Sequence, residues 1–153
     1  KKEGIMVRVD GLQSLSFFQR LSPEELQDIA NVMYEKNYPE RMNIFEEGTQ
    51  ESVMYIVKRG LVQIVRYRVG EEKILATFSE GEFFGEMSIF DFLPRSAFAR
   101  AGQNTCLLEI SKQDFDKLVE EKPNVAAKIL YGMMEEMTRR LRKMTLPESA
   151  FLF

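Results

Sequence analysis

The sequence has no histidine, and Cys106 is its only cysteine. Zinc and haem sites are built mainly from these two residue types, so a metal centre is not expected. A single cysteine cannot form a disulfide within the chain, which fits the reducing cytoplasm. Without histidine or an activated-serine motif, the chain also lacks the usual groups for acid–base and nucleophilic catalysis. We therefore expect a cytoplasmic protein that is not an enzyme and that holds no cofactor.

No apolar run approaches membrane-spanning length, and the N-terminus shows no signal-peptide pattern. The chain begins at Lys1 rather than at methionine, which leaves an upstream segment open. A net charge of −3 gives no general attraction to nucleic acids or to acidic membranes. A length of 153 residues suits one domain with its own core. We expect residues 1–153 to form a single domain that binds neither nucleic acid nor membrane.

The middle of the chain, residues 35–110, has the short apolar segments of β-strands. Glycines interrupt them about every ten residues, at Gly48, Gly60, Gly70 and Gly81. The apolar run 54–57 predicts a strand buried on both faces, and the charged stretch 66–73 predicts a hairpin tip. This spacing is typical of a jelly roll or a small β-barrel. We predict a mainly β fold with flanking helices, in which a jelly-roll β-barrel is followed by a long C-terminal helix.

Helices are expected before and after the barrel, over about 12–34 and 112–145. The first helix begins with a capping box, because Ser22 is a good N-cap and Glu25 follows it by three residues. Residues 1–10 are charged and weakly patterned, so we expect them to form a loose lead-in.

The longest helical stretch runs from Asn124 to Met144, and Pro147 is expected to end it. Five of its apolar residues are spaced four, three, four and three apart, as in a coiled coil. They are Leu130, Met134, Met137, Leu141 and Met144. Two interpretations are open: the stripe packs the helix against its own barrel, or it pairs two chains. We predict a homodimer through this helix.

Residues 83–101 combine groups that suit a small phosphorylated sugar. Gly85 permits a close approach of the backbone, and Glu86 is an acceptor for a hydroxyl group. Arg95 is a permanent planar cation suited to a phosphate, and Ser96 adds a hydroxyl and a backbone N–H beside it. The amides that follow Gly85 can open a short helix, whose N-terminus attracts anions.

Residues 84–97 contain Phe-Gly-Glu, a helical turn and then Pro-Arg-Ser-Ala. This order resembles the phosphate-binding cassette of cyclic nucleotide-binding domains, which occur in the catabolite activator protein and in the regulatory subunits of protein kinase A. We call residues 84–97 the cassette. The interval from Glu86 to Arg95 resembles kinase-type cassettes, whereas Ser96 resembles the bacterial activator. The resemblance covers about residues 15–144 and implies a 3′,5′-cyclic nucleotide as ligand.

The resemblance also implies a role for each cassette residue. Arg95 is expected to pair with the exocyclic oxygens of the cyclic phosphate. The Ser88 amide and the Ser96 amide or hydroxyl are expected to complete the phosphate site. Glu86 is expected to accept the ribose 2′-hydroxyl, with the Gly85 amide or carbonyl nearby. The further predicted cassette contacts are Phe84, Met87 and Ala97.

The base is expected to lie between the barrel and the C-terminal helix. Ile64 and Leu75 resemble residues of the apolar wall around the base, and plain core is the alternative for each. Aligning the helix end with the bacterial activator places Met144 and Thr145 near the adenine-contacting positions and Arg140 near the ligand. Met144 replaces a hydroxyl residue with a thioether, whereas Thr145 keeps a hydroxyl. We predict binding of cyclic AMP in preference to cyclic GMP.

The leading hypothesis for function is a ligand sensor, in which contacts made in only one arrangement bias the C-terminal helix. A contrasting hypothesis keeps the fold without a ligand and uses the helix to bind a partner chain. A third makes the chain the regulatory part of a larger protein. Activators of this family carry a helix-turn-helix domain after this helix, and residues 145–153 are too few for one. We therefore expect no DNA binding by the chain as given.

Overall fold

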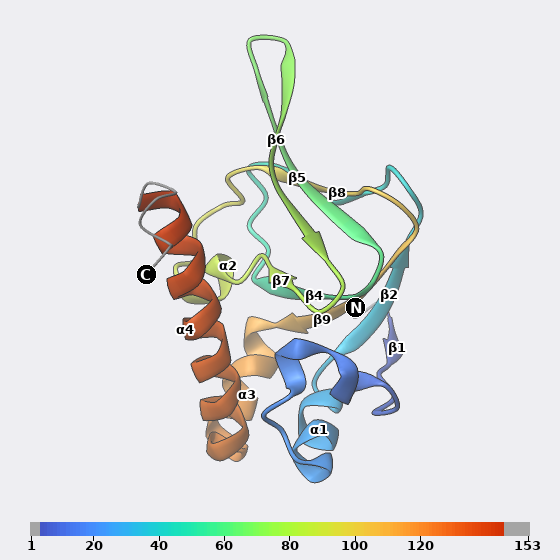
Figure 1. The fold of residues 1–153 in the computed structure, drawn as a ribbon, viewed down its shortest axis with the longest axis vertical. Coiled ribbons are helices and arrows are strands. Elements are labelled where there is room, and N and C mark those ends of the chain that lie inside the picture. The colour runs from blue at the N-terminus through green and yellow to red at the C-terminus, as the bar shows by residue number, and fades with distance from the viewer. Residues whose placement is uncertain (1–3, 146–153) are drawn as a thin grey trace.

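A computed structural model describes residues 4–145, so Pro147, the predicted helix end, lies outside the described residues. Two antiparallel sheets face each other; α1 (Pro23–Ala30) and α3 (Lys112–Glu121) lie at one end of them, and α4 (Pro123–Thr145) runs from that end along one side (Figure 1). This confirms the predicted class, a mainly β jelly roll with flanking helices and a long C-terminal helix. The two sheets share no strand pairing within residues 4–145, so the barrel is a two-sheet structure rather than a closed ring. No helix in that range is long and apolar enough to cross a membrane.

The first sheet has five strands in the order β1-β2-β9-β4-β7, and the second has four in the order β3-β8-β5-β6. The first sheet consists of β1 (Ile5–Met6), β2 (Tyr34–Tyr38), β9 (Thr105–Ser111), β4 (Val53–Arg59) and β7 (Phe83–Phe84). The second consists of β3 (Asn43–Phe45), β8 (Phe98–Ala101), β5 (Leu61–Arg68) and β6 (Glu71–Ser79). The predicted run at 54–57 lies in β4 and is fully buried.

The prediction of a loose lead-in is wrong for Ile5 and Met6, which form β1. They pair with Glu35 and Tyr34 at the edge of β2. An edge strand presents unpaired N–H and C=O groups, and a short segment that pairs there satisfies them. Both β1 side chains are exposed, so no hydrophobic pattern marks this strand in the sequence.

The N-terminal helical region is shorter than predicted, because β2 already begins at Tyr34. It consists of two 3₁₀ turns, η1 (Leu12–Ser14) and η2 (Ser16–Phe18), and of α1 (Pro23–Ala30). The predicted capping box is present: Glu25 N donates to Ser22 Oγ at 3.2 Å, and Ser22 N donates to Glu25 Oε1 at 2.9 Å. The buried residues of α1 are Leu26, Ile29 and Ala30.

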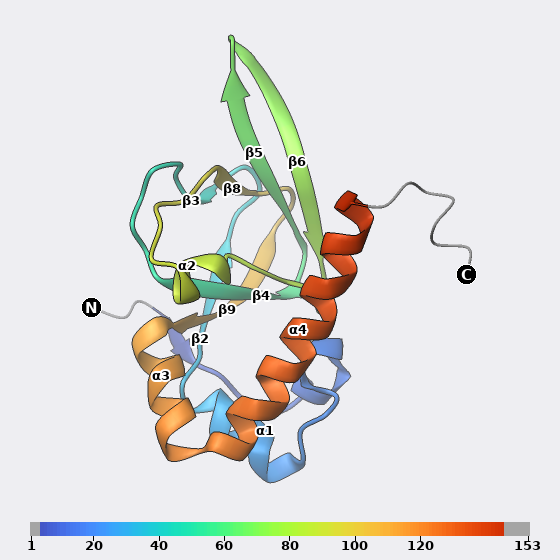
Figure 2. The ribbon, with the colours of Figure 1, turned by 90° about the vertical axis from the view of Figure 1, so that its left-hand side faces the viewer.

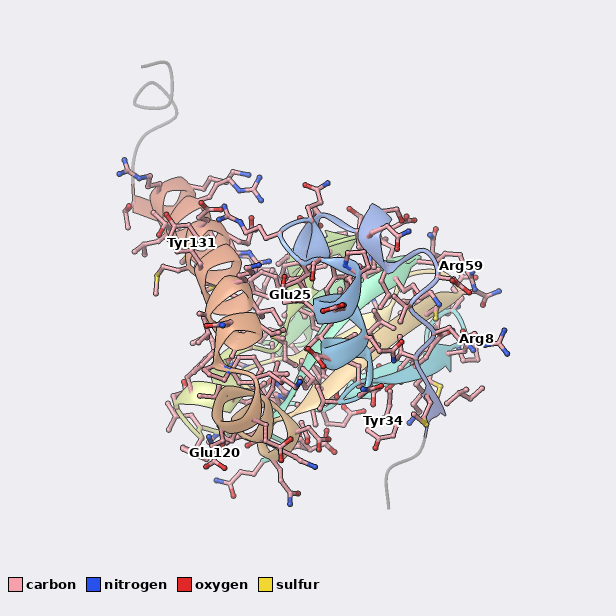
Figure 3. The ribbon with its side chains drawn as sticks, turned by 90° about the horizontal axis from the view of Figure 1, so that it is seen from below. Arg8, Glu25, Tyr34, Arg59, Glu120 and Tyr131 are labelled. Atoms are coloured by element: carbon pink, nitrogen blue, oxygen red, sulfur yellow. The ribbon has the colours of Figure 1, made fainter. Side chains whose placement is uncertain are left out.

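Two helices follow the barrel, α3 (Lys112–Glu121) and α4 (Pro123–Thr145). Ser111 caps α3, as its position predicts. Viewed from below, Glu25 of α1 lies toward α4 (Figure 3). Lys128 Nζ of α4 donates to Glu25 Oε1 at 2.7 Å, so an ion pair joins the two helices. The helices α1 and α3 and the first half of α4 thus pack together in the core cluster beneath the first sheet.

The predicted apolar seam is divided between two faces of α4. Leu130 and Met137 are half-buried against the chain's own core. They lie beside the buried residues Val125, Ala126, Ile129 and Met133. Met134, Leu141 and Met144 are 67%, 60% and 83% exposed. The helix therefore packs on its own barrel and still presents apolar side chains to solvent.

The hairpin of β5 and β6 extends away from the rest of the barrel (Figure 2). Its strands run to Arg68 and resume at Glu71, so the tip is only Val69 and Gly70. Both tip residues have left-handed backbones, with φ of 55° and 79°. Glycine adopts this conformation readily, whereas a β-branched residue there is unusual.

Candidate functional site

The cassette forms one wall of a cavity of about 290 Å³. Its other walls come from β3, β5 and β6 of the second sheet and from Arg140 of α4. The helical turn of the cassette is α2 (Met87–Phe90), which follows β7 directly. The predicted site residues that line the cavity are Phe84, Gly85, Glu86, Met87, Ser88, Arg95, Ser96, Ala97, Ile64 and Arg140. The structure thus brings all the predicted cassette contacts together with one strand residue and one residue of α4.

Leu75, predicted for the apolar wall, does not line the cavity. Ala76 pairs with Ile64 and lines the cavity, so Leu75 beside it points to the opposite face of β6. The next pair is Val65 with Ile74, which leaves a bulge at Leu75. Leu75 is therefore the extra residue of the bulge and its side chain is exposed. Ala76 occupies the position in the cavity wall that the family resemblance assigned to Leu75.

Met144 and Thr145 also lie outside the cavity. Both residues are exposed at the end of α4. The Thr145 hydroxyl donates to the Leu141 carbonyl oxygen at 2.9 Å, within the helix itself. The base contact predicted for these residues therefore requires a different position of the end of α4.

Gly85 is required by the geometry of the cassette. Its φ is 73°, and an added β-carbon would lie 2.9 Å from Arg95 Nη1 and 3.2 Å from Val53 O. Its carbonyl oxygen accepts from Arg95 Nη1 at 2.9 Å and from Ser88 Oγ at 3.0 Å. A side chain at this position would displace the arginine, which explains why the motif has glycine here.

Arg95 is a buried cation, with only 7% of its surface exposed. Its guanidinium donates to Gly85 O and, at 2.6 Å, to Val53 O. Its Nε is buried and has no hydrogen-bond partner among the residues that the structure describes. Arg95 takes part in none of the ion pairs found within residues 4–145. Burial lowers the pKa of Arg95, but an arginine stays charged at neutral pH. The cavity wall therefore holds a positive charge and a free donor that suit an anion.

Glu86 supplies a buried carboxylate to the same cavity. Burial raises the pKa of Glu86 above its ordinary value, while Arg140 and Arg95 act in the opposite direction. The nearest cation is Arg140, whose Nη1 lies 3.8 Å from Glu86 Oε1. A cation and a carboxylate acceptor thus face one cavity, an arrangement that suits a ligand with both an anionic group and hydroxyl groups.

Arg140 connects α4 to the cassette. Its Nη2 donates to Phe83 O at 2.7 Å, and its Nε donates to Glu136 Oε1 at 2.7 Å. Its guanidinium carbon lies 4.5 Å from the centre of the Phe83 ring and 4.9 Å from that of Phe78. Because Arg140 also approaches Glu86, its side chain lies between α4 and the buried carboxylate of the cassette.

Sequence reasoning missed several aromatic residues at this site, chiefly Phe45, Phe78 and Tyr55. Phe45 and Phe78 line the cavity, and the Tyr55 ring stacks on Phe84 with centroids 5.1 Å apart. Phe78 lies two residues after Ala76 in β6, so both share the cavity face of the strand. Nothing in the sequence distinguishes Phe45 from an ordinary core residue.

The model of the cyclic nucleotide-binding domain family matches residues 35–122, more than half of the chain. The chain belongs to this family, which confirms the resemblance drawn from the cassette. The cyclic AMP receptor protein of Thermus thermophilus is 35% identical to it over 127 residues, which make up 82% of this chain and 57% of that protein. The chain spans about half the length of the curated relatives it matches.

Solved structures agree with this assignment. The catabolite activator protein of Thermus thermophilus superposes with a TM-score of 0.72 at 32% identity, over 84% of this chain and 59% of that one. A cyclic nucleotide-binding domain from Methylobacillus flagellatus gives a TM-score of 0.78 at 23% identity, over 88% and 83% of the two chains. The second comparison concerns the fold alone.

Proposed function

We propose that the cavity binds a 3′,5′-cyclic nucleotide and that this binding controls the position of α4. One observation carries the proposal. Within residues 4–145, the buried polar or charged side chains are Glu86, Ser88, Arg95 and Thr105. The first three belong to the cassette and line the cavity. Burying such groups costs free energy unless they gain partners, so their presence in this wall indicates a ligand-binding role.

The ligand's parts match the groups present. Arg95 pairs with the cyclic phosphate through its charge and its free Nε. The Ser88 amide and the amide or hydroxyl of Ser96 complete the phosphate site. Glu86 accepts the ribose 2′-hydroxyl. The base lies against the apolar part of the wall, which includes Ile64.

Signalling to α4 passes through Arg140. This residue lies near Glu86 and also donates to the backbone of β7. A ribose hydroxyl bound to Glu86 alters the contact between Glu86 and Arg140. The ligand then favours one position of α4, because a ligand shifts a conformational equilibrium only when its contacts differ between the two states. The end of α4 then brings Met144 and Thr145 to the base, which favours cyclic AMP over cyclic GMP.

Calorimetric titration with cyclic AMP, cyclic GMP and AMP tests the proposal. We expect cyclic AMP to bind about tenfold more tightly than cyclic GMP, a difference of about 1.4 kcal/mol, which is the size of one base contact. Arg95→Ala should weaken binding by about a hundredfold or more, because it leaves the anion without its counter-charge. Circular dichroism checks that the variant is folded. Absence of binding by the wild type at millimolar nucleotide refutes the proposal.

We further propose that two chains pair through the exposed apolar side chains of α4, in particular Met134 and Leu141. Leu141→Glu should dissociate such a dimer, because it buries like charges against each other. Lys143→Glu is the matched control, since Lys143 lies two residues along the helix, away from this stripe. Sedimentation velocity at micromolar concentration gives the oligomeric state, and a monomeric wild type contradicts the pairing.

A second candidate function keeps the fold as a dimerisation module that binds no nucleotide, and the exposed stripe of α4 favours it. The two experiments separate the candidates: a dimer that gives no heat with any nucleotide supports the module. Nucleotide binding in this cavity fits equally a chain that is the regulatory part of a longer protein. The full-length reading frame decides which output the domain controls.

A further inference from the structure

Arg95 lies against two aromatic rings that come from different sheets. The guanidinium carbon is 4.1 Å from the centre of the Phe45 ring and 5.8 Å from that of Tyr55. Phe45 ends β3 in the second sheet, and Tyr55 lies in β4 of the first. The two ring centres are 5.8 Å apart, with their planes tilted by 35°. The arginine of the cassette thus sits where the two sheets meet.

These rings stabilise the buried positive charge of Arg95, a role that a carboxylate usually has for a buried arginine. The negative face of an aromatic ring attracts a cation, and the attraction grows when water is excluded. A carboxylate in contact with Arg95 would neutralise its charge and compete with an incoming anion. A ring stabilises the same charge and leaves it available to a ligand.

We propose that Phe45 is a positioning residue of the anion site, whose ring fixes the guanidinium of Arg95 for the ligand phosphate. The proposal rests on the proposed nucleotide-binding function. Phe45 is 8% exposed and lines the cavity. Its ring is itself held by Phe84 of the cassette, at 6.2 Å between centroids. Of the two rings it lies closer to Arg95, so its removal should have the larger effect.

The test compares Phe45→Leu, which removes the ring and keeps an apolar side chain, with Phe45→Tyr, which keeps the ring. Phe18→Leu is the matched control, because Phe18 is a fully buried ring in the other core cluster, packed against the helices. Two quantities are measured: the affinity for cyclic AMP by calorimetry, and the NMR resonance of the Arg95 Nε–H in the ligand-free protein. The Arg95→Lys variant assigns that resonance.

We expect Phe45→Leu to weaken binding of cyclic AMP by about tenfold, the size of a desolvated cation–π contact. The Arg95 resonance should also move, because the ring current of Phe45 is lost. Phe45→Tyr should restore both properties, and Phe18→Leu should alter neither. If Phe45→Leu does not fold, Phe45→Met serves in its place with the same expectations.

Two results would overturn the inference. One is an Arg95 resonance that stays in place without the ring, and the other is a loss of affinity no greater than that of Phe18→Leu. The resonance is observed without nucleotide, so it tests the placement of Arg95 independently of binding. A wild type that binds no nucleotide refutes the proposed function instead, and the two failures remain distinguishable.

Discussion

The two faces of the first sheet are built differently, although they come from the same strands. Successive residues of a strand point to opposite faces. Ile56 and Leu108 therefore join the core cluster that packs on the helices, and this cluster is wholly apolar. Tyr55 and Tyr38 join the cluster between the sheets, where the Tyr38 hydroxyl donates to Glu109 Oε1. The face toward the helices is packed with apolar side chains, whereas the face toward the second sheet also buries polar groups.

On the face of the first sheet that lies toward the second sheet, polar groups are buried close to the cavity, and this burial shifts their pKa values. Burial raises the pKa of Glu109, and burial together with this carboxylate raises the pKa of Tyr38 and Tyr55. Tyr55 therefore stays a neutral phenol beside Arg95. Comparison of the faces indicates that the helix side supplies apolar packing alone, whereas the barrel side also sets the electrostatic environment of the site.

The largest effect expected from this division is on stability. Ile56→Ala should lower the free energy of unfolding by about 2–5 kcal/mol, because it leaves a cavity in a fully buried position. Its affinity for cyclic AMP should equal that of the wild type under conditions where the variant is folded. Urea denaturation measures the first quantity and calorimetry the second. A loss of affinity comparable to that of Arg95→Ala would show that the faces are not separable.

A smaller effect concerns the pH dependence of stability. A carboxylate near the cavity and one on the helix side should change the free energy of unfolding in opposite directions. Burial raises the folded-state pKa of Glu86 above the ordinary value of 4.5, so the folded protein holds this proton more tightly than the unfolded chain. Ionisation of Glu86 therefore lowers the free energy of unfolding. This loss of stability builds up as pH rises from 4.5 through the raised pKa. Glu86→Gln should be more stable than the wild type at neutral pH, and the difference should vanish in acid.

Glu25, on the helix side, provides the opposite case. Its hydrogen bond from Lys128 lowers the folded-state pKa of Glu25 below 4.5. The stability it contributes is present above 4.5 and is lost as pH falls through the lowered pKa. Glu25→Gln should therefore be less stable than the wild type at neutral pH. Thermal unfolding of both variants between pH 3 and 8 checks the signs, and equal signs would contradict the assignment of the two carboxylates.

Local signals explain what the sequence could predict. The capping box at Ser22 is specified over a few residues and is present as predicted. The glycine, acid and arginine of the cassette are likewise close in the sequence, and they line one cavity. The contacts of Arg95 could not be predicted in this way. Phe45 precedes it by fifty residues in the sequence, and only the packing of two sheets brings the ring to the guanidinium.

Strand register sets another limit on prediction. The family resemblance assigns Leu75 to the cavity wall, but Ala76 is the residue that pairs with Ile64 and lines the cavity, so Leu75 points to the solvent side. Likewise, the apolar spacing of α4 predicts a single seam, whereas Leu130 faces the chain's own core and Leu141 is exposed. Both differences arise because a resemblance or an apolar spacing in the sequence does not reveal which part of the fold each face of a strand or helix contacts.

The smallest effect lies outside both faces, at the tip of the β5–β6 hairpin. Val69 has a φ of 55° and a fully exposed side chain, so its left-handed backbone is strained without any compensating burial. Such a conformation costs about 1–2 kcal/mol for an ordinary residue and less for asparagine, which is preferred in tight hairpin turns. Val69→Asn should therefore raise the free energy of unfolding by about 1 kcal/mol and leave nucleotide affinity unchanged. Val69→Ala is the control, since it removes the β-branch but keeps the β-carbon that opposes this backbone. Urea denaturation should rank asparagine above alanine; equal values would mean that the turn does not hold the backbone of Val69 in the left-handed region.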